Sequence, residues 1–92
     1  MVRMPYDLFI LPSCKKEIDK ACKNNTLLKE SLSKKIQEIC ESPFHYKPLR
    51  NELHGMRRVH ILKSFVLIFN VDENKKSVTL VSFSHYDTAY SR

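Results

Sequence analysis

Two arginines and a histidine follow the only glycine of the chain and could together hold a phosphate and move a proton beside it. Arg57, Arg58 and His60 come after Gly55, and the alternating residue types of Met56–Lys63 predict a strand. On such a strand Arg58 and His60 share one face, and Arg57 points to the other. Arginine offers a phosphate a fixed fork of donors, and imidazole ordinarily titrates near pH ~6.5. The segment therefore predicts an anion-binding strand that can also transfer protons, with an ordinary basic hairpin as the alternative.

The composition bounds the kind of protein that carries this strand. The chain has 92 residues, a net charge of +6 and a sequence pI of about 9.4. This length predicts a single domain, residues 1–92, and the charge favours an anionic partner, although a solvated lysine surface would give the same charge. The longest apolar run, Phe65–Phe69, is far shorter than the ~20 residues that a membrane span needs. We therefore expect no membrane association.

Cysteine usage points to a reducing compartment. Cys14, Cys22 and Cys40 are odd in number and lack a CxxC spacing, and no secretory signal precedes them. Free thiols in a cytoplasmic protein are the expectation. All three fall in predicted helices, on or beside apolar stripes, so a cysteine nucleophile is not expected. Because the histidines, cysteines and carboxylates show no metal-ligand spacing, we also predict no metal and no cofactor.

The first half of the chain predicts a strand and two helices. Met4–Leu11 is typical of a short strand, and Pro12 and Ser13 open a helix with Ser13 as the N-cap and Glu17 in the first turn. Asn24-Asn25 is a turn signal, Thr26 caps a second helix, and Pro43 ends it. The second helix carries an apolar stripe at helical spacing: Leu28, Leu32, Ile36, Ile39 and Cys40. Two helices joined by a short turn predict a helical hairpin.

The second half predicts three consecutive strands after a connector over Phe44–His54. The strands are Met56–Lys63, Phe65–Asp72 and Ser77–Ser84, with a polar turn at Asp72–Lys76. The element order β-α-α-β-β-β indicates an α+β domain, in which the first strand joins an antiparallel sheet at one edge and the helical hairpin covers one face. The best core candidates are Val59, Ile61, Leu67 and Phe69. Arg58 and His60 should then project from the opposite, open face.

Three stretches carry a resemblance to a known family: PLRNELHGMRRVHI, SFVLIFNVDE and VTLVSFSHYDTAY. In this order they resemble the RelE/ParE superfamily of toxins from type II toxin–antitoxin systems, in particular its RelE-like branch, over essentially the whole chain. The resemblance implies a RelE-like fold and a ribosome-dependent endoribonuclease that cleaves mRNA in the 30S A site. It further implies metal-independent attack by the RNA 2′-hydroxyl, inhibition of translation, and neutralisation by a cognate RelB-like antitoxin, with a heterotetramer as the expected assembly.

The resemblance also suggests which residues carry the chemistry. Such cleavage needs a base, an acid and cations for the developing charge on phosphorus. The catalytic candidates are His60, His85, Arg58 and Tyr90. The candidates for RNA binding are Lys47, Arg50, Arg57, Lys63, Tyr86 and Arg92. His60 and His85 are expected to act as paired proton-transfer groups on one face, and Tyr90 could stack on a splayed base.

One departure from the family pattern leaves other functions open. The family usually places an arginine after the aromatic of the central strand, where this chain has Val66. Arg58 and its neighbours could supply that charge instead. Alternatively, the protein could be a ParE-like toxin that inhibits DNA gyrase by binding it, or an RNA-binding module without catalysis.

Overall fold

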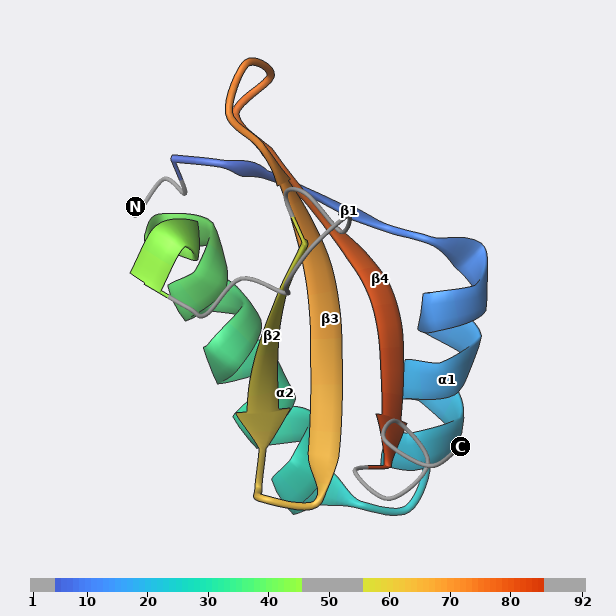
Figure 1. Ribbon diagram of the computed structural model, residues 1–92. Coiled ribbons are helices and arrows are strands. Elements are labelled where there is room, and N and C mark those ends of the chain that lie inside the picture. Colours follow the sequence, from blue (N-terminus) through green and yellow to red (C-terminus); the bar gives the residue numbers. More distant parts are fainter. Residues whose placement is uncertain (1–4, 46–55, 86–92) are drawn as a thin grey trace.

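The computed structural model describes residues 5–45 and 56–85, in which two helices lie against one face of a four-stranded sheet (Figure 1). The elements in chain order are β1 (Asp7–Ile10), α1 (Pro12–Cys22), α2 (Thr26–Glu41), a 3-10 turn (Pro43–His45), β2 (Met56–Ile61), β3 (Phe65–Asp72) and β4 (Ser77–His85). The predicted α+β order β-α-α-β-β-β is confirmed.

The strand order in the sheet is β1-β4-β3-β2. β2, β3 and β4 pair antiparallel, and β1 joins at an edge, as predicted. β1 runs parallel to β4, however, so the sheet is mixed rather than antiparallel throughout. A parallel pair needs a long crossover connection, usually helical, and the chain between β1 and β4 includes both helices and the two other strands.

Both helix starts differ from the predicted caps. Helix α1 begins at Pro12, Leu11 is the N-cap, and no side chain caps the helix. Proline suits the first helical position because its missing N–H would have no helical partner there. Helix α2 begins at Thr26, and its cap is Asn25, whose Oδ1 accepts a hydrogen bond from the Leu28 N–H at 3.0 Å. The predicted stop before Pro43 is confirmed, because α2 ends at Glu41.

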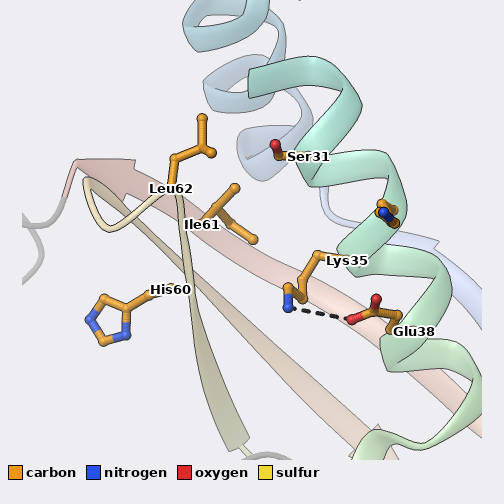
Figure 2. A pocket seen from close by; sticks show the side chains of 7 residues that line it. Ser31, Lys35, Glu38, His60, Ile61 and Leu62 are labelled. Carbon is orange, nitrogen blue, oxygen red and sulfur yellow. Dashed lines mark ion pairs between the residues drawn. The ribbon is translucent and has the colours of Figure 1, made fainter. Parts of the chain in front are cut away.

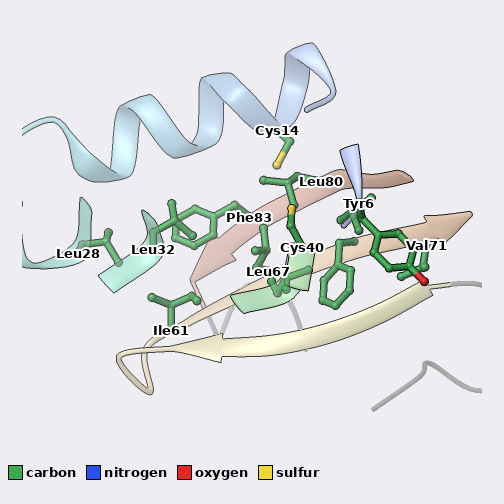
Figure 3. Packing of buried hydrophobic residues seen from close by; sticks show 13 residues of the cluster. Tyr6, Cys14, Leu28, Leu32, Cys40, Ile61, Leu67, Val71, Leu80 and Phe83 are labelled. Atoms are coloured by element: carbon green, nitrogen blue, oxygen red, sulfur yellow. The ribbon is translucent and has the colours of Figure 1, made fainter. Parts of the chain in front are cut away.

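The hydrophobic core lies between the helices and the sheet (Figure 3). Ile61, Leu67 and Phe69 are at most 2% exposed, and Val59 packs against them, so the predicted inner face is confirmed. The α2 stripe faces this core, with four of its members buried and Ile36 partly buried. Within residues 5–45 and 56–85, neither helix is long and apolar enough to cross a membrane.

A β-bulge interrupts the pairing of β3 with β4. Ile68 pairs with Ser82, whereas the next residue, Phe69, pairs with Leu80, so Val81 is the extra residue. An extra residue reverses the alternation of side chains beyond it. Leu80 points toward the helices before the bulge, and Phe83 does so after it, because both are buried in the core cluster.

A polar contact ties the start of the described chain to the turn between β3 and β4. The Tyr6 hydroxyl donates to Glu73 Oε1 at 2.8 Å, and Lys76 Nζ lies 3.1 Å from Glu73 Oε2. The hydrogen bonds from Tyr6 and then from Lys76 lower the pKa of Glu73 below its ordinary value of 4.5. The Tyr6 ring also meets Phe44 edge to face, at 6.3 Å between ring centroids.

This contact predicts a small dependence of stability on acid pH. A lowered carboxyl pKa in the folded state means that Glu73 stabilises the fold above its ordinary pKa, and that this contribution is lost as the pH falls through the folded-state value. Glu73→Gln should therefore flatten the acid side of the stability profile, measured by urea unfolding at a series of pH values. Identical profiles for the variant and the wild type would contradict this expectation.

Candidate functional site

The open face of the sheet, away from the helices, brings together the two candidate residues of β2. His60 pairs with Val66, which pairs with Ser84, and Arg58 pairs with Ile68, which pairs with Ser82. Paired residues on neighbouring strands project to the same face, so each set forms a row across the sheet. The predicted placement of Arg58 and His60 on the face opposite the core is confirmed.

These rows contain two residues that the sequence analysis missed. Ser82 and Ser84 are partly buried on β4, and their hydroxyls lie in the rows of Arg58 and His60. A hydroxyl can donate to a phosphate oxygen and accept from a ribose hydroxyl. Across β3, His60 and Ser84 are two strand spacings apart, or about 10 Å. This open face, defined by Arg58, His60, Ser82 and Ser84, is the candidate site.

His60 also borders a groove between β2 and α2. The groove has a volume of about 360 Å³ and is lined by Ser31, Lys34, Lys35, Glu38, His60, Ile61 and Leu62. Figure 2 shows the imidazole pointing away from α2, whereas Lys35 and Glu38 pair with each other on the helix at 3.3 Å. The exposed His60 ring therefore projects away from the helix, on the open face of the sheet.

His85 lies on the opposite side of the sheet from His60. It pairs with Phe65, which packs against the core, and the two rings meet edge to face with centroids 5.3 Å apart. It borders a mostly apolar hollow of about 430 Å³ with Glu17, Lys20 and Ala21 of α1. The expectation of paired proton-transfer groups on one face is therefore wrong.

The bulge at Val81 is the physical reason for this difference. Continuing the alternation from Val78 and Leu80 would place His85 on the open face, but the extra residue reverses it. The sequence holds a signal for this reversal. Its buried apolar residues change phase along β4, from Val78 and Leu80 to Phe83.

Arg57 and Lys63 do not lie on the open face. Arg57 pairs with Phe69 on the helix side, and its guanidinium lies over the Phe44 ring at 4.8 Å from the centroid. This contact indicates a packing role. Lys63 is exposed in the turn after β2, where it and Leu62 have positive φ angles of 62° and 53°. Lys63 remains a candidate RNA contact at the end of the sheet.

Several sequence candidates lie outside the described residues. They are Lys47, Arg50, Tyr86, Tyr90 and Arg92. Their assigned roles stay predictions. Within residues 5–45 and 56–85, no three His, Cys, Asp or Glu side chains are grouped to hold a metal ion.

Val66, at the position where the family carries arginine, projects from the same face between His60 and Ser84. It is only 1% exposed, so this face is covered at Val66 and is accessible at His60. It lies outside the core cluster beneath the helices. A valine gives a phosphate no donor. An arginine that contacts a phosphate in this row must therefore come from a neighbouring row of the same face, and Arg58 lies in the adjacent row.

The cysteines are placed for packing. Cys14 and Cys40 are fully buried, and Cys22 is partly buried. Burial, and then the charge of Glu17, raise the pKa of Cys14 to about 11, so this thiol is protonated at neutral pH. Burial also raises the pKa of Cys22 and of Cys40. A protonated, buried thiol is a poor nucleophile.

Thiol labelling should follow this order of burial. In the native protein we expect iodoacetamide to modify Cys22 first, and Cys14 and Cys40 only after denaturation, because the reagent needs an accessible thiolate. Peptide mass spectrometry at increasing labelling times measures the three rates. Labelling of native Cys14 as fast as Cys22 would contradict the packing described above.

Comparison with known proteins identifies a shared family. Residues 8–90 match the family model described as the ParE toxin of the type II toxin–antitoxin system parDE. A Methanocaldococcus jannaschii protein named "Putative toxin RelE4" is 45% identical over 87 residues, which make up 95% of this chain and 93% of the relative.

Solved structures show the same architecture. The chain matches the toxin–antitoxin complex RelBE of E. coli with a TM-score of 0.73 and 26% identity, covering 86% of this chain and 94% of the matched chain. It also matches a YoeB/ParE toxin from Agrobacterium tumefaciens with a TM-score of 0.77 and 13% identity, covering 87% of this chain and 98% of that one. The second match is a likeness of fold alone.

Proposed function

The chain belongs to the ParE toxin family of type II toxin–antitoxin systems, within the RelE/ParE superfamily, and we propose that it is a ribosome-dependent mRNA endonuclease. The observation that carries this proposal is that Arg58 and His60, two positions apart on β2, both lie on the open face. There they offer a cation and a proton-transfer group to one ligand. The resemblance to RelE-like toxins supplies the reaction: attack by the RNA 2′-hydroxyl on the adjacent phosphorus.

This reaction needs groups that transfer protons and groups that stabilise the charge on phosphorus. The 2′-oxygen forms a bond to phosphorus while the bond to the 5′-oxygen breaks, which gives a cyclic phosphate end and a free 5′-hydroxyl. One group must take the 2′-hydroxyl proton, and another must protonate the leaving oxygen. We assign one of these transfers to His60 and stabilisation of the phosphate charge to Arg58, with the Ser82 and Ser84 hydroxyls as further contacts.

His85 can serve the same phosphate only from the other side. The attacking and leaving oxygens lie roughly in line on opposite sides of phosphorus, so an acid and a base approach from opposite directions. The row of Ile61, Phe65 and His85 ends the sheet next to the row of His60. Because β3 separates the two histidines within the sheet, we place the scissile phosphate beyond that last row, past the end of the sheet.

A cognate antitoxin belongs to the same proposal. With its net charge of +6, the chain is suited to an acidic, partly disordered partner that folds as it binds. The fold is also that of the toxin in the E. coli RelBE complex. Co-expression with the product of the neighbouring reading frame should yield a complex that suppresses toxicity, and light scattering would measure whether it is a heterotetramer.

The direct test adds the purified protein to ribosomes translating a defined mRNA and maps the new 5′ ends. We expect cuts within the codon at the A site, in EDTA-treated protein as well as in untreated protein, and none in free mRNA. Intact message would overturn the nuclease proposal.

The second candidate function is inhibition of DNA gyrase by binding. The observation that favours it is the apolar Val66 in place of the family arginine. A supercoiling assay with the same protein preparation separates the two. Stalled supercoiling together with intact mRNA would replace the nuclease proposal by this one.

A further inference from the structure

A carboxylate of α1 is bonded to the backbone of β4 close to His85. The Phe83 N–H donates to Glu17 Oε1 at 3.0 Å, across 66 positions of the sequence. Phe83 is two residues beyond Val81, the extra residue of the bulge. Glu17 was expected in the first turn of this helix, but α1 begins at Pro12, so Glu17 lies beyond the first turn and contacts the sheet.

The hydrogen bond from Phe83 to Glu17 lies on the edge of β4 where β1 no longer pairs with it. Pairing of β1 with β4 ends at Ile10 and Leu80, followed by a hydrogen bond from the Leu11 N–H to the Leu80 carbonyl. In the part of the chain that the structure describes, β4 beyond Leu80 has a strand neighbour only on the β3 side. An edge N–H needs another acceptor there, and the Glu17 carboxylate provides one for Phe83.

Aromatic contacts connect that bond to His85. The Phe83 ring stacks on Phe65 with centroids 5.2 Å apart and planes 7° apart, and Phe65 in turn meets the His85 ring. A series of contacts therefore runs from Glu17 through Phe83 and Phe65 to His85. Holding the backbone at Phe83 holds the position of the His85 imidazole.

We propose that Glu17 is a positioning residue that keeps the end of β4 in its bulged register, so that His85 projects beside α1. Without an acceptor for the Phe83 N–H, the end of β4 can lose the bulge. A register shift of one residue moves each side chain beyond it to the other face, which would bring His85 to the side of His60 and expose Phe83. The catalytic meaning of this placement rests on the proposed function, whereas the placement itself does not.

Three substitutions at Glu17 separate hydrogen bonding from charge. Glu17→Gln keeps an acceptor oxygen at the same reach without the charge, Glu17→Asp keeps the charge with a shorter reach, and Glu17→Ala removes both. Glu30→Ala, an exposed glutamate of α2, is the matched control. Two NMR readouts report the placement directly: the hydrogen-exchange rate of the Phe83 amide and the nuclear Overhauser effect between the Phe65 and His85 rings.

In Glu17→Ala and Glu17→Asp we expect the Phe83 amide to exchange about 10- to 100-fold faster, as for a lost hydrogen bond to a charged group. The ring–ring signal should weaken or vanish. Glu30→Ala should retain both wild-type readouts. Glu17→Gln should retain the ring contact, with the Phe83 amide exchanging less than about 10-fold faster, because a neutral acceptor forms a weaker hydrogen bond. Wild-type exchange and ring contact in Glu17→Ala would overturn the proposal, as would a Gln variant that behaves like the Ala variant. If the Ala variant does not fold, the Gln and Asp variants decide by the same readouts.

Cleavage kinetics give the functional half of the test. If Glu17 positions His85, Glu17→Asp lowers kcat with little change in KM, and Glu17→Gln restores kcat. A change in KM alone would contradict it. If the wild-type protein cuts no mRNA, the proposed nuclease function fails, and the NMR readouts still decide whether Glu17 places His85.

Discussion

Replacing His60 by alanine is expected to lower the rate of mRNA cleavage by about 10²- to 10⁴-fold, the usual contribution of a positioned acid or base. The exposed imidazole projects from the open face in the row of Val66 and Ser84, and Arg58 lies in the adjacent row. The fold should be unaffected, because His60 lies outside the core. Single-turnover cleavage on programmed ribosomes measures the effect, and circular dichroism checks the fold.

The matched control is His45→Ala. His45 is an exposed histidine of the 3-10 turn and carries no assigned role. Its removal should change the cleavage rate less than about 3-fold, a margin well below the expected catalytic effect. A His60 variant as active as the His45 variant would remove His60 from the reaction. The open-face site would then lose its main support.

A double alanine variant of His60 and His85, measured in the same cleavage assay, tests whether the two histidines act on one phosphate. Residues that act on one phosphate as a unit lose activity non-additively. The double alanine variant should therefore be close in rate to the slower single variant. Effects that multiply fully would place the two histidines in independent roles, which would fit their positions on opposite faces of the sheet without a shared phosphate.

The largest expected effect on stability comes from Phe69→Ala. Phe69 is fully buried at the centre of β3, and such a substitution typically costs about 3–5 kcal/mol through lost burial and the cavity that remains. A small domain is stable by only about 5–15 kcal/mol, so the variant would be marginal. The loss corresponds to a melting temperature at least about 12 °C lower for a chain of this size.

Phe9→Ala is the matched control for this change. Phe9 is 57% exposed on β1, so the same atoms are removed with less than half of the loss of buried surface. The expected loss is about 1 kcal/mol, because full burial of such a side chain contributes roughly 1.5–3 kcal/mol. Guanidinium unfolding of both variants gives the free energies of unfolding. Equal losses in the two variants would contradict the placement of the core between helices and sheet.

The sequence predicted most of the fold because its signals are local. The period of the α2 stripe, the stop at Pro43 and the alternation along β2 each depend on residues within a few positions of one another. The inner face of the sheet and the outward direction of Arg58 and His60 follow from that alternation alone. The predicted cap of α2 was wrong because Thr26 and Asn25 are both acceptable cap residues, and the residue type cannot choose between close neighbours. The predicted cap of α1 was wrong because Pro12 itself starts the helix, which begins before Ser13 without a side-chain cap.

For the candidate site, the sequence by itself determined that Arg58 and His60 share one face, because a strand alternates with a period of two. Only the tertiary structure decided that His85 does not share that face. The bulge at Val81 reverses the alternation of β4, and its register depends on the pairing with β3 and on the bond from Phe83 to Glu17, which comes from the other half of the chain. Such a contact has no local period, so it exists only once the helix has packed beside the sheet.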